Sequence, residues 1–99
     1  MKLQMHAVHF DADSKLIDFI QRKVDKLEAI YERVVDGEVF LKLENGEAVD
    51  NKIVEIKLNI PGNQLFVKEQ SESFEAAADQ AVEIMRRQLK KHKEKQSAR

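Results

Sequence analysis

Apolar residues recur at every second position in some segments of this chain and at every third or fourth position in others, and this switch is the strongest constraint on its fold. Alternation of apolar and polar residues over 2–9, 39–44 and 54–60 predicts three strands, each buried on one side. A fourth, short strand is expected around Leu65 to Lys68. Turns are expected at Asn45-Gly46, in a loop that runs on to Asp50-Asn51, and at Pro61-Gly62-Asn63.

Two segments with the longer spacing predict helices. Asp13 is a good N-cap, and the apolar residues after it define one face of a long helix that continues to about Arg33 and is ended by Asp36-Gly37. Ser73 caps a second helix, which at 1.5 Å per residue is roughly 30 Å long. The apolar face of this second helix contains Phe74, Ala77, Ala78, Ala81, Met85, Leu89 and His92.

The order of these elements is β-α-β-β-β-α, and each of them has one apolar face or stripe. The arrangement that buries all of these faces is an α+β fold, a four-stranded mixed sheet with two helices packed on one face. The β-α-β start requires a right-handed crossover, so the first two strands are expected to be parallel and the last three to form an antiparallel meander. Residues 1–95 are expected to form a single domain, and 96–99 a frayed C-terminal tail.

Composition limits the chemistry that is available to the chain. It has no cysteine, which excludes disulfides, thiol catalysis and zinc sites with thiolate ligands. No apolar run approaches the ~20 residues of a membrane span, so no membrane association is expected and the localisation is expected to be cytoplasmic.

Catalysis is not expected either. The histidines are His6, His9 and His92, and the first two would point to opposite faces of their strand, which breaks up any common set of metal ligands. No Ser-His-Asp spacing or glycine-rich phosphate loop is present. We therefore expect no enzyme activity, no catalytic residue, no cofactor, no metal and no small-molecule substrate.

The net charge of −1 conceals a strong segregation of charge. Residues 86–99 contain seven basic residues and one acid, Glu94, whereas acids outnumber bases in the rest of the chain. The helix dipole favours cations only in the last turn, so a basic cluster of more than two turns is best complemented by an external polyanion. The cluster on the second helix consists of Arg86, Arg87, Lys90, Lys91 and Lys93.

The first helix is predicted to be basic on one flank and acidic on the other. On a helical wheel, four basic residues lie within about 20° of one another beside the apolar stripe, and Lys23 lies next to them. If this flank borders the basic end of the second helix, the combined strip suits a phosphate backbone. The alternative is a solvated helix face with incidental charge pairs. The four residues are Lys15, Arg22, Lys26 and Arg33.

Four stretches carry a family resemblance. Residues 76–79, Ala-Ala-Ala-Asp, and 87–93, Arg-Gln-Leu-Lys-Lys-His-Lys, resemble the second helix of the hibernation-promoting factor / ribosome-associated inhibitor A (YfiA) family. Residues 23–28 resemble the K-x-x-K-L-E motif of its first helix, and 39–44 are similar to one of its strands. The resemblance is to the short form, without the extra C-terminal domain with which long forms pair two ribosomes. It implies the fold derived above, which is like that of a double-stranded-RNA-binding domain.

The resemblance also implies a function. Family members bind the small ribosomal subunit around the decoding site and mRNA channel, contact its rRNA and block translation in resting cells. The implied role is a translation inhibitor that promotes ribosome hibernation under stress and in stationary phase, with the small subunit as partner. Five basic residues match family positions, and Arg22, Arg86 and Lys90 are added from charge geometry. The matching residues are Lys23, Lys26, Arg87, Lys91 and Lys93.

Two other functions stay open. Phe40 and Phe66 are expected on the outer faces of their strands, where with Ile53 they would form an apolar patch on the uncovered side of the sheet. Such a patch suits a protein-interaction module, or a homodimer formed through the outer sheet face. The other alternative is generic binding of double-stranded RNA, which depends on helix shape and not on a ribosomal site.

Overall fold

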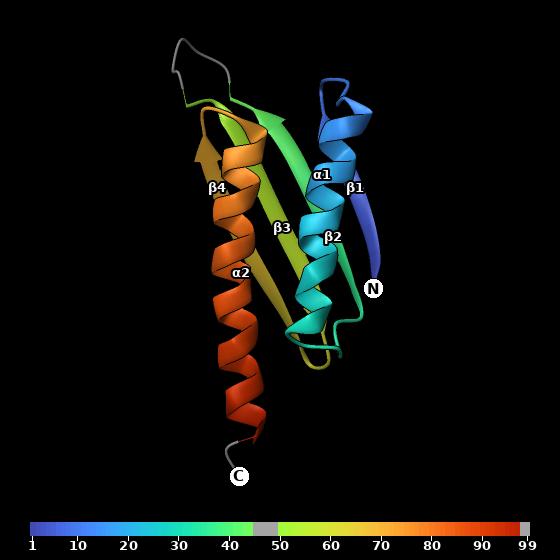
Figure 1. The fold of residues 1–99 in the computed structure, drawn as a ribbon, viewed down its shortest axis with the longest axis vertical. Coiled ribbons are helices and arrows are strands. Elements are labelled where there is room, and N and C mark those ends of the chain that lie inside the picture. Colours follow the sequence, from blue (N-terminus) through green and yellow to red (C-terminus); the bar gives the residue numbers. More distant parts are fainter. Residues whose placement is uncertain (45–49, 98–99) are drawn as a thin grey trace.

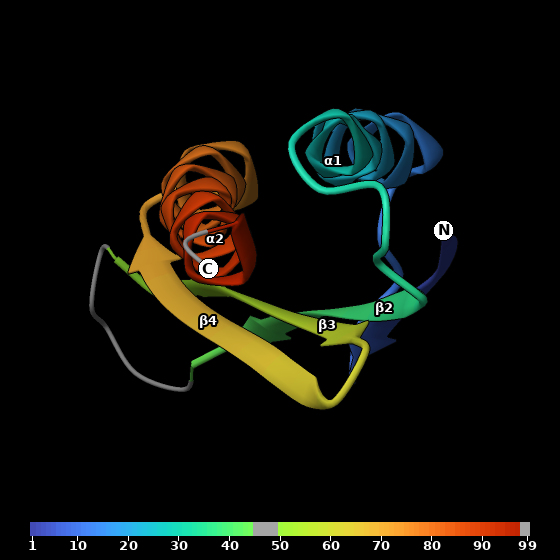
Figure 2. The same ribbon diagram turned by 90° about the horizontal axis from the view of Figure 1, so that it is seen from below.

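Four strands form one sheet, and both helices pack on the same face of it (Figures 1 and 2). The computed structural model describes residues 1–44 and 50–97, with side chains through Lys95. The element order is the predicted β-α-β-β-β-α. The elements are β1 (Lys2–Val8), α1 (Ser14–Asp25), the 3-10 helix η1 (Lys26–Ala29), β2 (Asp36–Leu43), β3 (Lys52–Ile60), β4 (Asn63–Ser71) and α2 (Phe74–Ser97).

The strands lie in the order β1-β2-β3-β4. β1 and β2 are parallel, with Met5 opposite Val39, and this confirms the crossover predicted for the β-α-β start. The other two pairs are antiparallel, with Val39 opposite Ile56 and Ile56 opposite Val67. The two helices run side by side in the same direction, so that their C-terminal ends lie toward the same end of the molecule (Figure 1).

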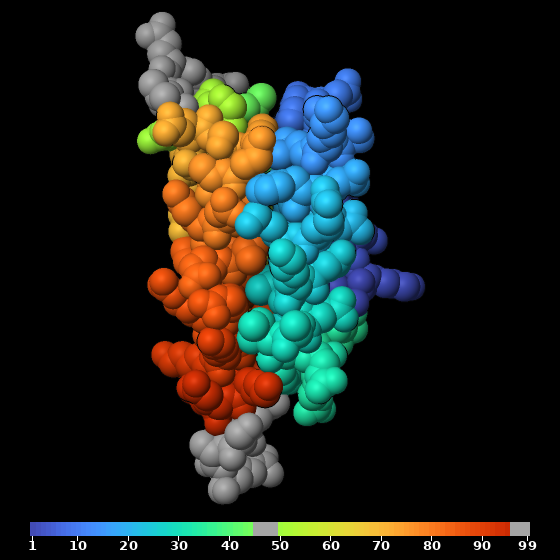
Figure 3. Space-filling view, viewed as in Figure 1, coloured from blue at the N-terminus to red at the C-terminus, as the bar shows by residue number. Residues whose placement is uncertain are grey.

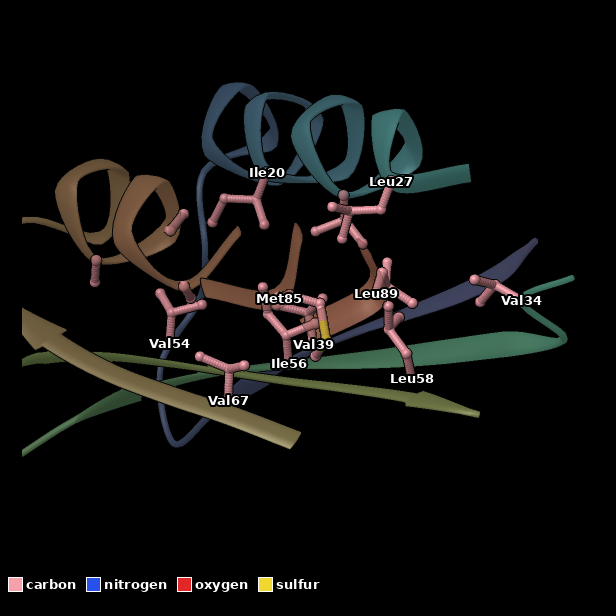
Figure 4. Packing of buried hydrophobic residues seen from close by; sticks show 14 of the residues in the cluster. Ile20, Leu27, Val34, Val39, Val54, Ile56, Leu58, Val67, Met85 and Leu89 are labelled. Atoms are coloured by element: carbon pink, nitrogen blue, oxygen red, sulfur yellow. The ribbon is translucent and has the colours of Figure 1, made fainter. Parts of the chain in front are cut away.

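The hydrophobic core lies between the sheet and the helical layer (Figure 4). Val39 and Ile56 of the sheet, Ile20 of α1, and Met85 and Leu89 of α2 are all fully buried in it. Burial of each large aliphatic side chain contributes about 1.5–3 kcal/mol. The side of α2 that packs on β3 and β4 also carries small residues, which let its backbone approach the sheet closely. These residues, all fully buried, are Ala77, Ala78 and Ala81.

Both predicted helix caps are present. The Asp13 carboxylate accepts a hydrogen bond from the Lys15 amide at 3.1 Å, and the Ser73 hydroxyl accepts one from the Ala76 amide at 3.0 Å. Each bond satisfies an amide that has no partner within its helix. α2 continues to Ser97, into the segment predicted as a tail, whose last two residues lie outside the described part of the chain. Within the described residues, neither helix is both long and apolar enough to cross a membrane.

The first helix is shorter than predicted. α1 ends at Asp25 and η1 at Ala29, so the expected continuation of one helix to Arg33 is wrong. The apolar spacing nevertheless continues, and Leu27, Tyr31 and Val34 are all buried. A 3-10 turn keeps residues three apart on the same side, as an α-helix nearly does, so the spacing alone does not reveal where the α-helix stops.

Asp36-Gly37 does not end a helix but begins β2, which corrects a second prediction. A Cβ at Gly37 would lie 2.7 Å from Leu58 Cδ2 and 3.3 Å from the Lys57 carbonyl oxygen. The glycine is therefore required by close packing in the sheet. The Asn59 side chain, near the end of β3, donates a hydrogen bond to Asp36 at 2.5 Å and accepts one from Gln64 at 2.8 Å. It therefore links the start of β2 to the start of β4.

The last strand is longer than the short one predicted at Leu65 to Lys68, since β4 runs over Asn63–Ser71 and pairs with β3 along its whole length. Polar residues at both ends of β4 hide its extent from an apolar pattern, whereas backbone pairing does not depend on them. The turn before it is confirmed, with Gly62 at φ 77°, a value that favours glycine. The turn predicted at Asn45-Gly46 lies outside the described residues.

Candidate nucleic-acid interface

The two helices meet along a seam on the face of the molecule shown in Figure 3. Lys23 Nζ of α1 lies 2.5 Å from Asp79 Oδ1 of α2. Closer to the C-terminal end of α2, the rings of Tyr31 and His92 meet edge to face, with their centroids 5.2 Å apart. The seam therefore places the end of α1 beside the first half of α2, and the residues after η1 beside its basic second half.

Lys23 is held in this seam. Besides its ion pair with Asp79, its ammonium lies 5.3 Å from the centroid of the Phe19 ring, and 34% of its side chain is exposed. An ammonium with both a carboxylate and an aromatic neighbour is largely compensated within the protein. Lys23 was predicted as an rRNA-binding residue, and its geometry is better suited to fastening α1 to α2.

Glu83 engages the two arginines that follow it on α2. Arg86 donates hydrogen bonds from Nε and Nη2 to the two Glu83 carboxylate oxygens, at 3.1 and 2.8 Å. The hydrogen bond from Arg86 lowers the pKa of Glu83 and raises the pKa of Arg86. Arg87 Nε lies 3.5 Å from Glu83, but 72% of the Arg87 side chain is exposed. Arg87 is therefore more accessible to an external anion than Arg86.

The lysines near the end of α2 diverge to two sides of the helix. Lys90 and Lys93 line a hollow together with Ala29 and Ile30, on the side of η1. Lys91 instead lines a hollow that also contains Asn63, Leu65 and Lys95, on the side of the turn between β3 and β4. The basic end of α2 thus presents charge both along the helix seam and beside the sheet edge.

A larger open hollow of about 550 Å³ lies where the segment after η1 approaches α2. Arg33 and Lys93 line it from opposite elements, together with Glu28, Tyr31 and Glu32. Arg33 was expected on the flank of a long helix with Lys15, Arg22 and Lys26, and this is wrong because α1 ends at Asp25. The fold brings Arg33 instead to a hollow that it shares with Lys93 of the basic end of α2.

The basic flank of α1 is less separated from its acids than the helical wheel suggests. Arg22 lines a shallow hollow with Asp18 and Asp25, and its Nε donates to the Asp18 carbonyl oxygen at 3.3 Å. Lys15 and Lys26 are exposed, and Lys26 begins η1, which packs on α2. Of the first-helix residues that were predicted to bind rRNA, Lys26 is therefore the one best placed to act with α2.

Some of these charge pairs can be predicted from the sequence, and others cannot. Glu83 stands three and four residues before Arg86 and Arg87, a spacing that indicates pairing on a helix surface. Asp79 and Lys23 are far apart in the chain, and only the packing of the helices brings them together. Among the described residues, no group of three or more histidines and acids is arranged to hold a metal ion.

The outer face of the sheet differs from the apolar patch that was predicted there. Ile53 is 8% exposed and Phe66 48% exposed, so these two do not form one open surface. Phe40 is half-buried, because the His6 ring stacks on it at a centroid distance of 4.8 Å. His9 lies beyond β1 with φ 64°, so the expectation that His6 and His9 occupy one strand is wrong.

The amino-acid sequence matches a family and several known proteins. A family described as "Sigma 54 modulation protein / S30EA ribosomal protein" matches residues 3–97. A ribosome hibernation promoting factor of Pseudomonas putida is 30% identical over 98 residues, which cover 99% of this chain and 92% of that protein. A ribosome hibernation promoting factor of Azotobacter vinelandii is 29% identical and is covered over 89% of its length, against 100% of this chain.

Solved structures share the fold. A ribosomal subunit interface protein from Coxiella burnetii aligns with a TM-score of 0.84 at 18% identity, covering 94% of this chain and 98% of that one. The N-terminal domain of Thermus thermophilus Protein Y aligns with a TM-score of 0.79 at 22% identity, covering 93% and 99%. At these identities the two structures support the architecture of the sheet and helices.

Proposed function

The chain belongs to the Sigma 54 modulation protein / S30EA ribosomal protein family, and from this premise we propose that it binds the ribosome and promotes its hibernation. The observation that carries the proposal is the match to hibernation promoting factors along nearly the whole chain. The segregation of basic residues onto the second half of α2 supports it independently, because rRNA is a polyanion. The protein acts by occupying a site, without catalysing a reaction, in the cytoplasm where ribosomes work.

The proposed binding site lies in the decoding and mRNA-channel region of the small subunit. The exposed basic residues of α1, η1 and α2, which we call the helix surface, contact rRNA phosphates there, and the bound protein blocks translation. Each phosphate that is neutralised releases counterions, so binding is expected to weaken steeply with salt. The exposed basic residues proposed to contact rRNA directly are Lys26, Arg87, Lys90, Lys91, Lys93 and Arg22. Lys23 and Arg86 contribute mainly by holding the helix surface in place.

The proposal is tested by co-sedimentation with purified small subunits at low and moderate salt. Reversal of three of these charges, in the variant Lys26→Glu/Lys91→Glu/Lys93→Glu, is expected to abolish binding at moderate salt and to relieve inhibition of translation in vitro. Exposed surface charges contribute little to folding, so the variant should keep the circular dichroism spectrum of the wild type.

Two controls separate the site from general effects. Lysine-to-arginine changes at the same three positions keep the charge and should retain binding. The double variant Lys2→Glu/Lys52→Glu changes the net charge away from both helices and should bind nearly as well as the wild type. If wild-type protein sediments with ribosomes at neither salt concentration, the hibernation proposal is wrong. Equal affinity for free RNA duplex would favour generic double-stranded RNA binding instead.

A homodimer through the outer sheet face stays a prediction. Its support is weaker than the sequence suggests, because Ile53 is buried and Phe40 is covered by His6. Sedimentation equilibrium of the free protein measures the oligomeric state directly.

A further inference from the structure

Aromatic and basic side chains alternate across the face of the sheet that the helices leave uncovered. The His6 ring lies parallel to Phe40 within 17°, and the ammonium groups of Lys42 and Lys57 lie 5.8 and 5.9 Å from the Phe40 centroid. Lys57 pairs directly with Phe66 across β3 and β4. Lys68 follows two residues after Phe66 on β4, so these residues share one face across all four strands. We call them the aromatic sheet surface: His6, Phe40, Lys42, Lys57, Phe66 and Lys68.

The charges on this surface favour an anionic partner. Each of the two acids on this face has a partner at 3.1 Å, since Glu55 forms an ion pair with Lys42 and Glu38 contacts the His6 ring. In the register of the sheet, Glu38 lies opposite Lys57 and Glu55 opposite Lys68. Within the part of the chain that the structure describes, neither Lys57 nor Lys68 has an ion pair with a carboxylate. Lys57, opposite Phe66 on β3, and Lys68, two residues along β4, are therefore available to phosphates.

The aromatic groups favour an unpaired base. Phe66 exposes 48% of its surface and lies directly opposite Lys57 across β3 and β4. Bases of single-stranded RNA stack on such rings with little dependence on sequence, and nearby cations hold the backbone. A homodimer through this face is disfavoured, because it would bring Lys57 and Lys68 of both copies to one interface, where their like charges repel.

We propose that the aromatic sheet surface is a second RNA-contacting site, which stacks an unpaired base on Phe66 and holds the adjacent phosphates with Lys57 and Lys68. The site rests on the proposed function, since it takes a single-stranded segment of the same rRNA partner. It lies on the opposite side of the sheet from the helix surface (Figure 2), so the protein contacts RNA from two sides.

The test uses an eight-nucleotide single-stranded RNA and the whole chain. In NMR titrations, the ring signals of Phe66 and Phe40 should shift with the RNA. Phe66→Leu keeps an apolar side chain and should lower affinity roughly 5- to 150-fold, the range found for loss of one stacked base. Val35→Ala is the matched control, since Val35 is also an exposed apolar residue, at 59%, but lies outside the strands. It should leave affinity unchanged.

Two results would overturn the inference. One is an RNA titration that shifts only helix signals while Phe66→Leu binds like the wild type. The other is a wild-type dimer that Phe66→Leu dissociates, with no effect of that change on RNA affinity. Ribosome co-sedimentation of Phe66→Leu and the wild type distinguishes failure of the sheet site from failure of the proposed function. Ribosome binding by the wild type, together with either of these results, rejects the sheet site alone, whereas a wild type that does not bind ribosomes rejects the proposed function.

Discussion

Lys23 and Arg86 are both cationic residues of the predicted rRNA site, and each already has a carboxylate partner, Asp79 and Glu83 respectively. A single side chain can therefore belong to a basic motif without offering its charge to a ligand. This distinction is set at the scale of atoms, because an ion pair depends on a few ångströms of separation.

The Lys23–Asp79 pair is expected to contribute to stability rather than to binding. Because the pair is partly exposed, a double-mutant cycle with Lys23→Met and Asp79→Asn should give a coupling energy of about 0.2–1 kcal/mol. The measurement is urea unfolding of the wild type, both single variants and the double variant. If the coupling is zero while Lys23→Met abolishes ribosome binding, Lys23 is a direct contact and the positioning role is wrong.

Glu83 should make a pH-dependent contribution to stability. Its pKa in the folded protein is lowered, first by the hydrogen bond from Arg86. A group with a lowered folded pKa stabilises the fold above its unfolded pKa, and this stabilisation is lost as pH falls through the lowered value. NMR titration should show the Glu83 pKa returning toward the ordinary value of a glutamate in Arg86→Met. The same titration in Arg87→Met should show a smaller change, and equal changes in both variants would contradict the assignment.

At the scale of elements, the start of β2 depends on close packing that a residue pattern does not specify. Gly37 is the second residue of β2 and has no room for a side chain, between Leu58, Leu3 and a backbone carbonyl of β3. The same site shows why Asp36-Gly37 resembles a helix stop: glycine serves both roles, and its neighbours in space decide which one applies.

Gly37→Ala is expected to destabilise the protein by about 1–3 kcal/mol, the usual cost of overpacking a dense core. Thermal unfolding followed by circular dichroism measures the loss. The double variant Gly37→Ala/Leu58→Val should recover part of it, because Leu58 Cδ2 is the atom nearest to the added methyl group. Stability of Gly37→Ala equal to that of the wild type would show that the Leu58 and Leu3 side chains move aside without cost.

At the scale of the whole molecule, the sheet separates two surfaces of different chemistry. The helix surface is basic and has few aromatic groups that face solvent, whereas the aromatic sheet surface combines rings with lysines. A ligand that surrounds the domain would contact both surfaces at once.

If both surfaces contact the same RNA, their contributions should add. Lys91→Glu/Lys93→Glu and Phe66→Leu lie on opposite layers, so the free-energy losses of the two variants should sum within about 0.5 kcal/mol. Ribosome affinities of the wild type, each variant and the combination provide the comparison. A combination no weaker than the helix variant alone would show that the sheet surface does not touch the bound ribosome.

The order of the four strands and two α-helices is predictable from the sequence alone, as are both helix caps, the mixed sheet and the basic character of the end of α2. These features follow from neighbours within four residues, and from rules of chain connection that apply to any β-α-β unit. Tertiary structure alone decided that α1 stops at Asp25, that β4 extends to Ser71, and that Lys23 pairs with Asp79. Those outcomes depend on hydrogen bonds and contacts between segments far apart in the chain, whose geometry exists only once the layers have packed.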